Sequence, residues 1–414
     1  MRVLVLGAGV VGLASAYALA TDGHDVTVLE RNPGVGQGAS FANGAQLSYS
    51  YVAPLASPEV TKNLPGWMWV AESPIRFRPG LSPRMWGWAA RFLLACSRSK
   101  FRTTVRQLLA LTSLSQELLR TLLRHETLDF DLTRSGKLVV YSDPAALRDA
   151  ATLLDFQRSL GCDQQLLDTA ACLTLEPALT HMRQRLQGGI FAPGDETGDC
   201  ARFCGGLAQI LTVRYGVRIL LDTPLLALRS QNRRVVAANT RHGELEADAY
   251  VMALGTAARH FAGSLGFDLP IVGLKGYSLT VPITAASVPR LSVTDMRDKI
   301  VYAPLGRFLR IAGIADLERD ETNVRPERLA LLERRARSTF PEGLDYGRAV
   351  TWVGARPVTP SGVPILGLSP TNENLYLNVG HGALGFTLAM ASGRLVADRL
   401  AGRSPAASLQ GLLS

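Results

Sequence analysis

The stretch VLVLGAGVVGLASAYALATDGHDVTVLE, residues 3–30, decides the fold of this chain. Residues 2–6 form a short apolar run that is typical of a strand buried in a parallel sheet. The glycines of a GxGxxG pattern, Gly7, Gly9 and Gly12, follow at once. Residues 13–21 then predict a helix that ends at Gly23, and residues 25–29 predict a second strand. This order of strand, glycine turn, helix and strand predicts a Rossmann-like unit that binds a dinucleotide.

Each residue of the pattern has a physical task in such a unit. Gly7 makes the tight turn, Gly9 lets the backbone approach a pyrophosphate, and Gly12 lets the helix pack on the sheet. The helix N-terminus offers free N–H groups to the phosphates. Glu30, at the end of the second strand, can accept hydrogen bonds from ribose hydroxyls, and its charge disfavours a 2′-phosphate. The predicted dinucleotide contacts here are Gly7, Gly9, Val10, Val11, Gly12, Glu30 and Arg31.

The loop after the second strand favours FAD over NAD. An NAD domain would continue with alternating helices and strands, but residues 32–48 read NPGVGQGASFANGAQLS. Small residues and hydrogen-bonding side chains suit a chain that runs along a bulky cofactor, although a mobile surface loop has the same composition. The loop residues that we expect at the cofactor are Ser40, Asn43, Gln46 and Leu47.

Length and composition limit the number of domains, the location of the protein and the kinds of site that it can contain. The chain has 414 residues, of which 47% are hydrophobic, enough for two domains with buried cores. It contains neither a long apolar run nor a secretory signal pattern, so we expect a cytoplasmic protein. The five cysteines are odd in number and form no Cys-x-x-Cys pair, so neither a disulfide framework nor a metal site is predicted.

The net charge of +9 is concentrated in one segment. Residues 73–116 carry eight Lys and Arg residues and no acid, and Trp67, Trp69, Trp86 and Trp88 lie within or beside this segment. Amphipathic helices with tryptophan and arginine suit an anionic membrane surface, which gives a hypothesis of peripheral attachment to the inner face of the cytoplasmic membrane. The alternative is a helix pair that packs into the domain and leaves its arginines in water. No nucleic-acid-binding motif accompanies the charge.

Several long motifs make the chain similar to a known family. They are VLGAGVVGLASAYAL, SFANGAQLSYSYVAPLASP, PGDETGDCARF, DAYVMALGT, IVGLKGYSLTVP, WVGARPVTPSGVPILG and LYLNVGHGALGFTLAMASG. The sequence resembles the FAD-dependent D-amino-acid oxidase and glycine oxidase superfamily, and more narrowly the small subunit of bacterial D-amino acid dehydrogenases. The likeness runs nearly end to end, and the basic segment is the part that matches poorly.

The resemblance implies an α/β fold of two domains. A Rossmann-like FAD-binding domain would be assembled from the separated segments 1–45, 195–262 and 350–414. A substrate-binding domain with a mixed sheet, of the α+β kind, would comprise residues 46–194 and 263–349. The buried strands expected near residues 248–255 and 375–380, and the helix expected from Ala383, agree with this division. Asp199 is the expected N-cap of a helix, although a loop over the flavin is the alternative.

The resemblance also implies where the isoalloxazine and the substrate lie. The family's pattern places around the ring Gly380, His381, Gly382, Leu384, Gly385 and Thr387. Gly255, at the end of an expected buried strand, is a second place where the backbone can meet the cofactor. Arg356 precedes a proline with little slack around it, which suits a bidentate clamp on a carboxylate, and the matching arginine of the family binds the substrate carboxylate. Tyr277 is a candidate substrate contact or a core residue, and His381 a flavin or substrate contact or a structural hydrogen-bonding residue. The catalytic candidates are therefore Arg356, Tyr277 and His381.

The implied activity is oxidative deamination of a D-amino acid to a 2-oxo acid and ammonia, with hydride transfer to non-covalent FAD and electrons passed to a quinone or another acceptor. Covalent attachment is not expected, because no cysteine follows Cys204. Three alternatives remain open: oxidation of glycine, sarcosine or a cyclic D-imino acid such as D-proline or hydroxyproline; a non-catalytic flavin subunit; and an NAD-dependent dehydrogenase.

Overall fold

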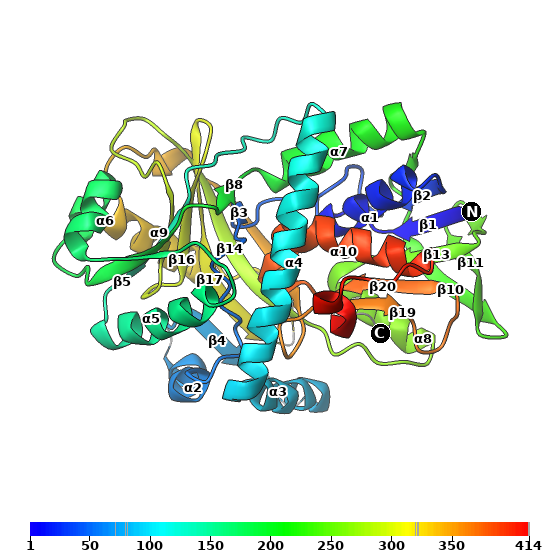
Figure 1. Ribbon diagram of the computed structural model, residues 1–414, viewed down its shortest axis with the longest axis horizontal. Helices are drawn as coiled ribbons and strands as arrows, with labels where there is room; N and C mark the ends of the chain where they lie inside the picture. Colours follow the sequence, from blue (N-terminus) through cyan, green and yellow to red (C-terminus); the bar gives the residue numbers. More distant parts are fainter. Residues whose placement is uncertain (71, 79, 81, 319, 321–322, 413–414) are drawn as a thin grey trace.

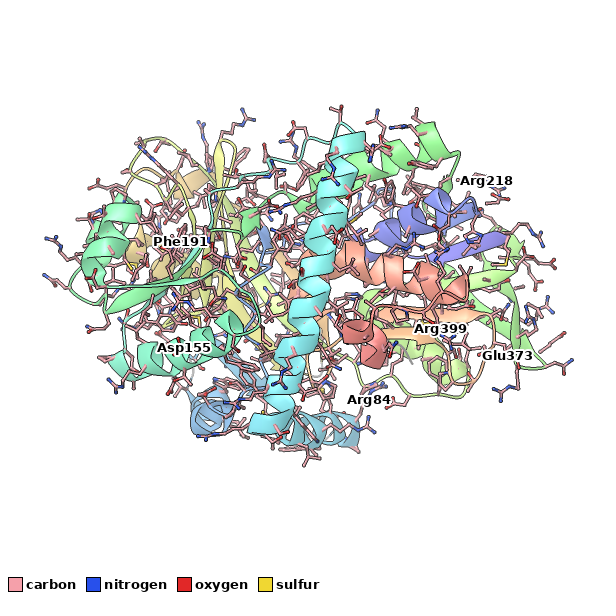
Figure 2. The ribbon with its side chains drawn as sticks, viewed as in Figure 1. Arg84, Asp155, Phe191, Arg218, Glu373 and Arg399 are labelled. Atoms are coloured by element: carbon pink, nitrogen blue, oxygen red, sulfur yellow. The ribbon has the colours of Figure 1, made fainter. Side chains whose placement is uncertain are left out.

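The molecule is built on two large sheets that lie at opposite ends of its long axis (Figure 1). The computed structural model describes residues 1–70, 72–78, 80, 82–318, 320 and 323–412. Figure 2 labels Phe191 on the side of one sheet and Arg218 and Arg399 on the side of the other.

The first sheet has six strands and contains the opening motif. Its central strands are parallel, and only the edge strand β19 runs antiparallel to its neighbour. In sheet order the strands are β19 (Ile365–Leu368), β20 (Leu375–Val379), β13 (Ala249–Met252), β1 (Arg2–Leu6), β2 (Asp25–Leu29) and β9 (Arg218–Leu220).

Both faces of this sheet are covered, which explains why β1 is apolar and buried from Val3 to Leu6. Val3 and Val5 pack into a cluster with α1 (Val10–Thr21), α7 (Cys200–Tyr215) and α10 (Gly385–Leu400). Leu4 and Leu6 point the other way, toward α8 (Ala258–Ser264) and a sheet formed by β10 (Leu225–Gln231), β11 (Arg234–Thr240) and β12 (Gly243–Leu245). Alternate residues of one strand thus serve two cores.

The second sheet is mixed and has nine strands. Its main path runs through β18 (Val350–Val358), β14 (Val272–Pro282), β17 (Phe308–Glu318), β16 (Ile300–Leu305), β15 (Ser292–Asp295), β5 (Lys137–Tyr141), β7 (Gly188–Ala192) and β6 (Gln165–Leu167). The ninth strand, β4 (Ile75–Arg78), pairs with β17. The helix α9 (Pro326–Thr339) packs on one face of this sheet, and the other face turns toward residues 42–52.

The remaining elements connect these layers. A two-stranded ribbon pairs β3 (Gln46–Leu47) with β8 (Glu196–Thr197). The other helices are α2 (Val60–Trp69), α3 (Pro83–Ala95), α4 (Arg98–His125), α5 (Pro144–Arg158) and α6 (Thr169–Leu175). The described 3-10 helices are η1 (Pro177–Met182), η2 (Gly255–Ala257), η3 (Tyr346–Arg348), η4 (Gly382–Leu384) and η5 (Ala407–Leu412).

The long helix α4 contacts both halves of the molecule and crosses the front of the view in Figure 1. Its Leu108 and Leu111 pack with α10 and β19, and Leu119 and Leu122 join the core of the six-stranded sheet. Thr112 also donates a hydrogen bond of 2.7 Å to the backbone oxygen of Tyr49, in the segment that leads into the other half.

The predicted fold class is confirmed: an α/β unit with a parallel sheet is assembled from separated segments and joined to a mixed sheet with helices. The strands predicted near residues 248–255 and 375–380 are β13 and β20, and the helix predicted from Ala383 is η4 followed by α10. The domain boundaries stay a prediction. The strand β18, which falls in the range assigned to the FAD-binding domain, is hydrogen-bonded into the nine-stranded sheet.

The basic segment forms helices, as expected, but its tryptophans differ in their surroundings. Trp88 is buried and donates a 3.3 Å hydrogen bond to the oxygen of Val358, whereas Trp86 is 49% exposed. Trp67 is half-buried, and the side chain of Trp69 lies outside the described residues. None of the described helices combines the length and the hydrophobicity that a membrane span requires. All five cysteines are free thiols.

Candidate active site

The glycine turn between β1 and α1 has the geometry that the sequence predicts. Gly7 adopts a left-handed φ of +105°, and a Cβ there would lie 2.7 Å from the oxygen of Ala253. A Cβ on Gly12 would lie only 1.8 Å from the oxygen of Gly7, so this glycine is required for the helix to pack on the turn. A Cβ on Gly9 would meet only Ser40 Oγ, at 3.5 Å. The open side of the turn is therefore at Gly9, where a pyrophosphate would approach.

Glu30 closes the turn from the end of β2. The carboxylate is 8% exposed and accepts a hydrogen bond of 2.9 Å from the backbone N–H of Ala8 at Oε2. Its Oε1 accepts hydrogen bonds from the backbone N–H and the side-chain amide of Asn32, at 3.0 and 2.7 Å. The carboxylate is thus fixed beside the turn, where ribose hydroxyls are expected. Arg31 is exposed.

The loop at residues 32–48 runs from this turn to the large sheet. Ser40 Oγ accepts a hydrogen bond from the N–H of Val10, at 3.1 Å, so the loop begins against α1. Asn43 accepts a hydrogen bond of 2.9 Å at its backbone oxygen from Arg310 of β17. The amide of Gln46 donates hydrogen bonds to the hydroxyls of Ser292 and Thr294, at 2.7 and 3.1 Å. The loop residues predicted at the cofactor therefore bridge the two sheets.

The turn after β20 lies next to the end of this loop. Gly380 and Gly382 have left-handed φ values of +83° and +56°, and between them His381 forms a bridge with Val358 at the end of β18. Thr387 Oγ1, in the first turn of α10, accepts a hydrogen bond of 3.1 Å from the N–H of Ser48. Leu47 is buried, whereas Leu384 and Gly385 are half-buried. This arrangement brings the predicted segments 40–48 and 380–387 together.

His381 is neutral in the folded protein. The side chain is 3% exposed, and burial lowers the pKa of its imidazole to about 3. Its Nε2 atom has no hydrogen-bond partner among the described residues. A buried polar atom without a partner is costly, so this nitrogen is a candidate contact for a bound group.

Arg356 lies on the face of the large sheet that turns toward this loop. The residue pairs with Leu274 of β14, and its guanidinium lies over Gly276, where a Cβ would be 2.4 Å from Nη2. Burial of the guanidinium lowers the pKa of Arg356, and burial is the single cause of this shift. Within the described part of the chain no carboxylate pairs with this guanidinium. Arg356 is half-buried, and a partly desolvated cation without a carboxylate partner is suited to an anionic ligand.

The structure does not bring Tyr277 to Arg356. Tyr277 follows Gly276 in β14 and points to the opposite face, where it is fully buried with α9 in a hydrophobic cluster. Its hydroxyl donates a hydrogen bond of 2.7 Å to Asp316, which also forms an ion pair of 2.9 Å with Arg328. Burial, and then this hydrogen bond, raise the pKa of the phenol. Tyr277 therefore has the surroundings of the core residue that was the alternative prediction.

Asp199 is the N-cap of α7, as the sequence predicts. Its Oδ1 accepts hydrogen bonds from the N–H groups of Ala201 and Arg202, at 2.9 and 3.0 Å. The nearby Asp195 is fully buried and accepts hydrogen bonds from the N–H groups of Tyr49 and Ser50.

Sequence reasoning missed two buried cations beside the loop. Lys137 donates a hydrogen bond of 2.9 Å to Ser48 Oγ, and burial lowers the pKa of its ammonium while Asp195 opposes that shift. Arg310 links Asn43 to Thr280 of β14 and to Asp199. A lysine directly after Gly136 at the start of an apolar strand was the available signal for Lys137. Arg310 carries no comparable signal, because Asn43 and Asp199 are more than a hundred residues away in the chain and Thr280 is thirty residues away.

The residues present fit FAD. The loop contacts α1 through Ser40, next to the open space at Gly9, and contacts Thr387 through Ser48. The left-handed glycines 380 and 382 and the His381 nitrogen, which has no partner among the described residues, belong to the turn just before Thr387. Gly255, also left-handed, has no neighbouring atom within 4 Å of a Cβ built there. No group of three or more potential metal ligands occurs in the described residues.

Comparisons with known proteins agree with this arrangement. The chain is 44% identical to "D-amino acid dehydrogenase 2" of Ralstonia nicotianae, over 98% of each chain. It is 43% identical to "D-amino acid dehydrogenase 2" of Pseudomonas aeruginosa, over 100% of this chain and 98% of that one. Among solved structures, glycine oxidase from Bacillus cereus superimposes with a TM-score of 0.75 at 21% identity, covering 100% of this chain and 98% of that chain. L-proline dehydrogenase from P. horikoshii gives a TM-score of 0.76 at 17% identity, covering 98% and 95%.

These structural similarities establish the fold, and a match to a sequence family establishes the family. The sequence pattern of the family described as "FAD dependent oxidoreductase" matches residues 2–399, which is nearly the whole chain. The predictions of an enzyme, of an oxidoreductase and of FAD as its cofactor are confirmed. The chain belongs to the FAD-dependent oxidoreductase family.

Proposed function

We propose that the protein oxidises D-amino acids to 2-oxo acids and ammonia. The observation that carries this proposal is the half-buried guanidinium of Arg356, which pairs with no carboxylate among the described residues and lies on the sheet face next to the loop at residues 32–48. The curated relatives with 43–44% identity over nearly their full lengths are named as D-amino acid dehydrogenases, which supports a D-amino acid as the substrate.

In this proposal the protein supplies binding and orientation. Arg356 holds the substrate carboxylate through a bidentate hydrogen bond, which leaves the Cα–H free to point in one direction. His381, which is neutral, lines the site with an imidazole nitrogen rather than with a second positive charge. A bound FAD would supply the two-electron acceptor for this reaction: the substrate would lose a hydride from Cα and a proton from nitrogen, and water would hydrolyse the resulting imine to ammonia and the 2-oxo acid.

The proposed cofactor contacts are the predicted residues, in the arrangement described above. The glycine turn with Val10 and Val11 would hold the pyrophosphate, and Glu30 the ribose. Residues 40–47 and 380–387, with Gly255, would contact the remainder of the FAD, which is held without a covalent bond. We leave Tyr277 out of this set because it faces the opposite side of the sheet.

An anaerobic titration of the yellow holoprotein tests this function. D-amino acids should bleach the flavin absorbance and yield one 2-oxo acid for each reduced flavin, and their L-enantiomers should not. Glycine, sarcosine and D-proline belong in the same panel, because preference for one of them would redirect the assignment. A flavin that stays oxidised with every compound would instead indicate a non-catalytic flavin subunit.

For the electron acceptor we propose a quinone or another carrier, reached at a membrane surface. The face of α3 that points away from the core exposes Trp86, Leu93 and Leu94, at 49%, 43% and 65%. Exposed basic side chains at the same end of the molecule are Arg84, Arg91, Arg98, Lys100 and Arg102. Figures 1 and 2 show α2, α3, Arg84 and one end of α4 at this end. Apolar side chains framed by cations suit the cytoplasmic surface of an anionic membrane.

A further inference from the structure

Two glycines form a trough on the sheet face that carries Arg356. Gly276 of β14 and Gly354 of β18 are direct partners in the antiparallel pair, and the register between these strands is continuous. Partners in an antiparallel pair project to the same face, and residues two apart in one strand share a face. Trp352, Gly354 and Arg356 therefore lie on one face, opposite to that of Val353.

Two side chains lie along this trough and approach each other. A Cβ on Gly276 would lie 2.4 Å from Nη2 of Arg356, and a Cβ on Gly354 would lie 2.0 Å from Cη2 of Trp352. Partner Cβ positions are about 5 Å apart, so the guanidinium and the end of the indole are at most about 10 Å apart. The anchor for the carboxylate thus has an aromatic side chain as its neighbour in the same row of the sheet.

The indole is not used to fill the protein core. Trp352 is half-buried and does not belong to any hydrophobic cluster of the described residues, whereas its neighbour Val353 packs into the cluster on the opposite face. Its strand partner Ser278 donates a hydrogen bond of 2.8 Å to the oxygen of Ala42. The row that carries the indole is thereby tied to the loop predicted to hold the flavin.

We infer that the indole of Trp352 is the wall against which the substrate's side chain packs, and that it selects apolar and aromatic amino acids. This inference rests on the proposed function. The side chain of an α-amino acid starts one bond beyond the carbon that bears the carboxylate. When Arg356 holds the carboxylate, a side chain the size of leucine or phenylalanine spans the distance to the indole, whereas alanine does not. Contact between two apolar surfaces favours the larger substrates.

Steady-state kinetics of the purified holoenzyme with a soluble dye acceptor test the inference. Trp352→Ala should lower kcat/KM for D-phenylalanine and D-leucine by about 10-fold or more relative to D-alanine. Trp352→Phe should keep most of the discrimination, because an aromatic wall remains. Gly354→Ala should reproduce the loss with the indole still present, since its Cβ takes the place of the ring. Val350→Ala, at a 64% exposed position of the same strand, is the matched control.

A binding measurement separates this inference from the proposed function. Propanoate and 3-phenylpropanoate carry the carboxylate with and without the ring, and both are titrated by their effect on the flavin spectrum. Trp352→Ala should weaken 3-phenylpropanoate by about 10-fold and leave propanoate within about 3-fold. This holds even if no D-amino acid reduces the wild-type flavin, a result that would overturn the proposed function alone. Equal losses for both carboxylates, or for all D-amino acids, would overturn the role of Trp352.

Discussion

At the scale of single residues, Arg356 shows what a short motif can and cannot specify. An arginine fixed before a proline predicts an anion clamp, and the structure places its guanidinium on a sheet face where no carboxylate of the described residues pairs with it. The motif does not show why there is room for it. That room comes from Gly276, a residue of the neighbouring strand β14 that lies 80 positions earlier in the chain, where a side chain would collide with the guanidinium.

Removal of this guanidinium should affect substrate and cofactor differently. Arg356→Ala should raise KM for D-amino acids by about 100-fold or more, because a buried charge pair with the carboxylate is lost. FAD should stay bound, since the glycine turn and the loop are unchanged. Steady-state kinetics and the flavin absorbance per mole of protein give the two values. Arg348→Ala, at an arginine that is 83% exposed just before β18, provides the control. An unchanged KM for every amino acid would refute the clamp.

His381 should make the stability of the protein depend on pH. Burial lowers its pKa from 6.5 to about 3, so between these values the unfolded chain binds a proton that the folded chain does not. The contribution of His381 to the free energy of unfolding is therefore at its full value above pH 6.5. Below pH 6.5 it decreases by about 1.4 kcal/mol per pH unit. In urea unfolding, the free energy of unfolding of the wild type minus that of His381→Asn should decrease by about 2 kcal/mol from pH 7 to pH 5.

His242 is exposed, and His242→Asn is the control: its difference in free energy of unfolding from the wild type should be the same at pH 7 and pH 5. A difference between wild type and His381→Asn that is independent of pH would mean that the imidazole does titrate normally in the folded protein.

At the scale of elements, the opening unit was predictable because its signals are local. Strand, turn, helix and second strand lie within thirty residues, and each glycine has a conformational or steric reason that the sequence pattern already implies. The face of Tyr277 was not predictable in this way. It depends on the register of β14 with its neighbours. The pairing of β14 with β17 is shifted by a bulge at Ile314, whose φ is +51°. An isoleucine in the sequence does not predict such a bulge.

Two glycines of the opening turn should fail in different ways. Gly9→Val should abolish FAD binding but leave the chain folded, because a Cβ there meets only Ser40 Oγ at 3.5 Å and the new methyl groups would occupy the pyrophosphate's place. Gly12→Ala should lower the free energy of unfolding by about 2 kcal/mol, because its Cβ would lie 1.8 Å from a backbone oxygen. Bound flavin absorbance and urea unfolding of the apoprotein distinguish the two. A yellow Gly9→Val protein would contradict the assignment of the turn.

At the scale of the whole molecule, the structure shows which side chains accompany the positive charge at the surface, and the composition alone could not show this. The sequence shows that α3 is amphipathic, but the division of its tryptophans between core and surface depends on tertiary packing. Trp88 is used to build the core beside β18, and Trp86 is left outside with Leu93 and Leu94. Only the outward side chains can take part in binding to a membrane.

Flotation with liposomes tests this surface. The holoprotein should float with vesicles that contain about one-third anionic phospholipid at low salt, and should be released at high salt, because charge attraction is screened. Leu93→Glu together with Leu94→Glu should abolish flotation and leave turnover with a soluble dye unchanged. Leu166→Glu, on an exposed leucine of β6 at the far edge of the nine-stranded sheet, should float as wild type does. If wild type does not float at low salt, the membrane proposal is refuted.

The helix α4 has a consequence for how a substrate enters. It is continuous for 28 residues, packs against α10 and the six-stranded sheet, and binds through Thr112 and Gln116 to Tyr49 and Gly194 on the way to the other half. A hinge between the two halves would have to bend this rod or break those bonds. We therefore expect an amino acid to reach the guanidinium through displacement of surface segments, while the two halves keep their relative positions during turnover.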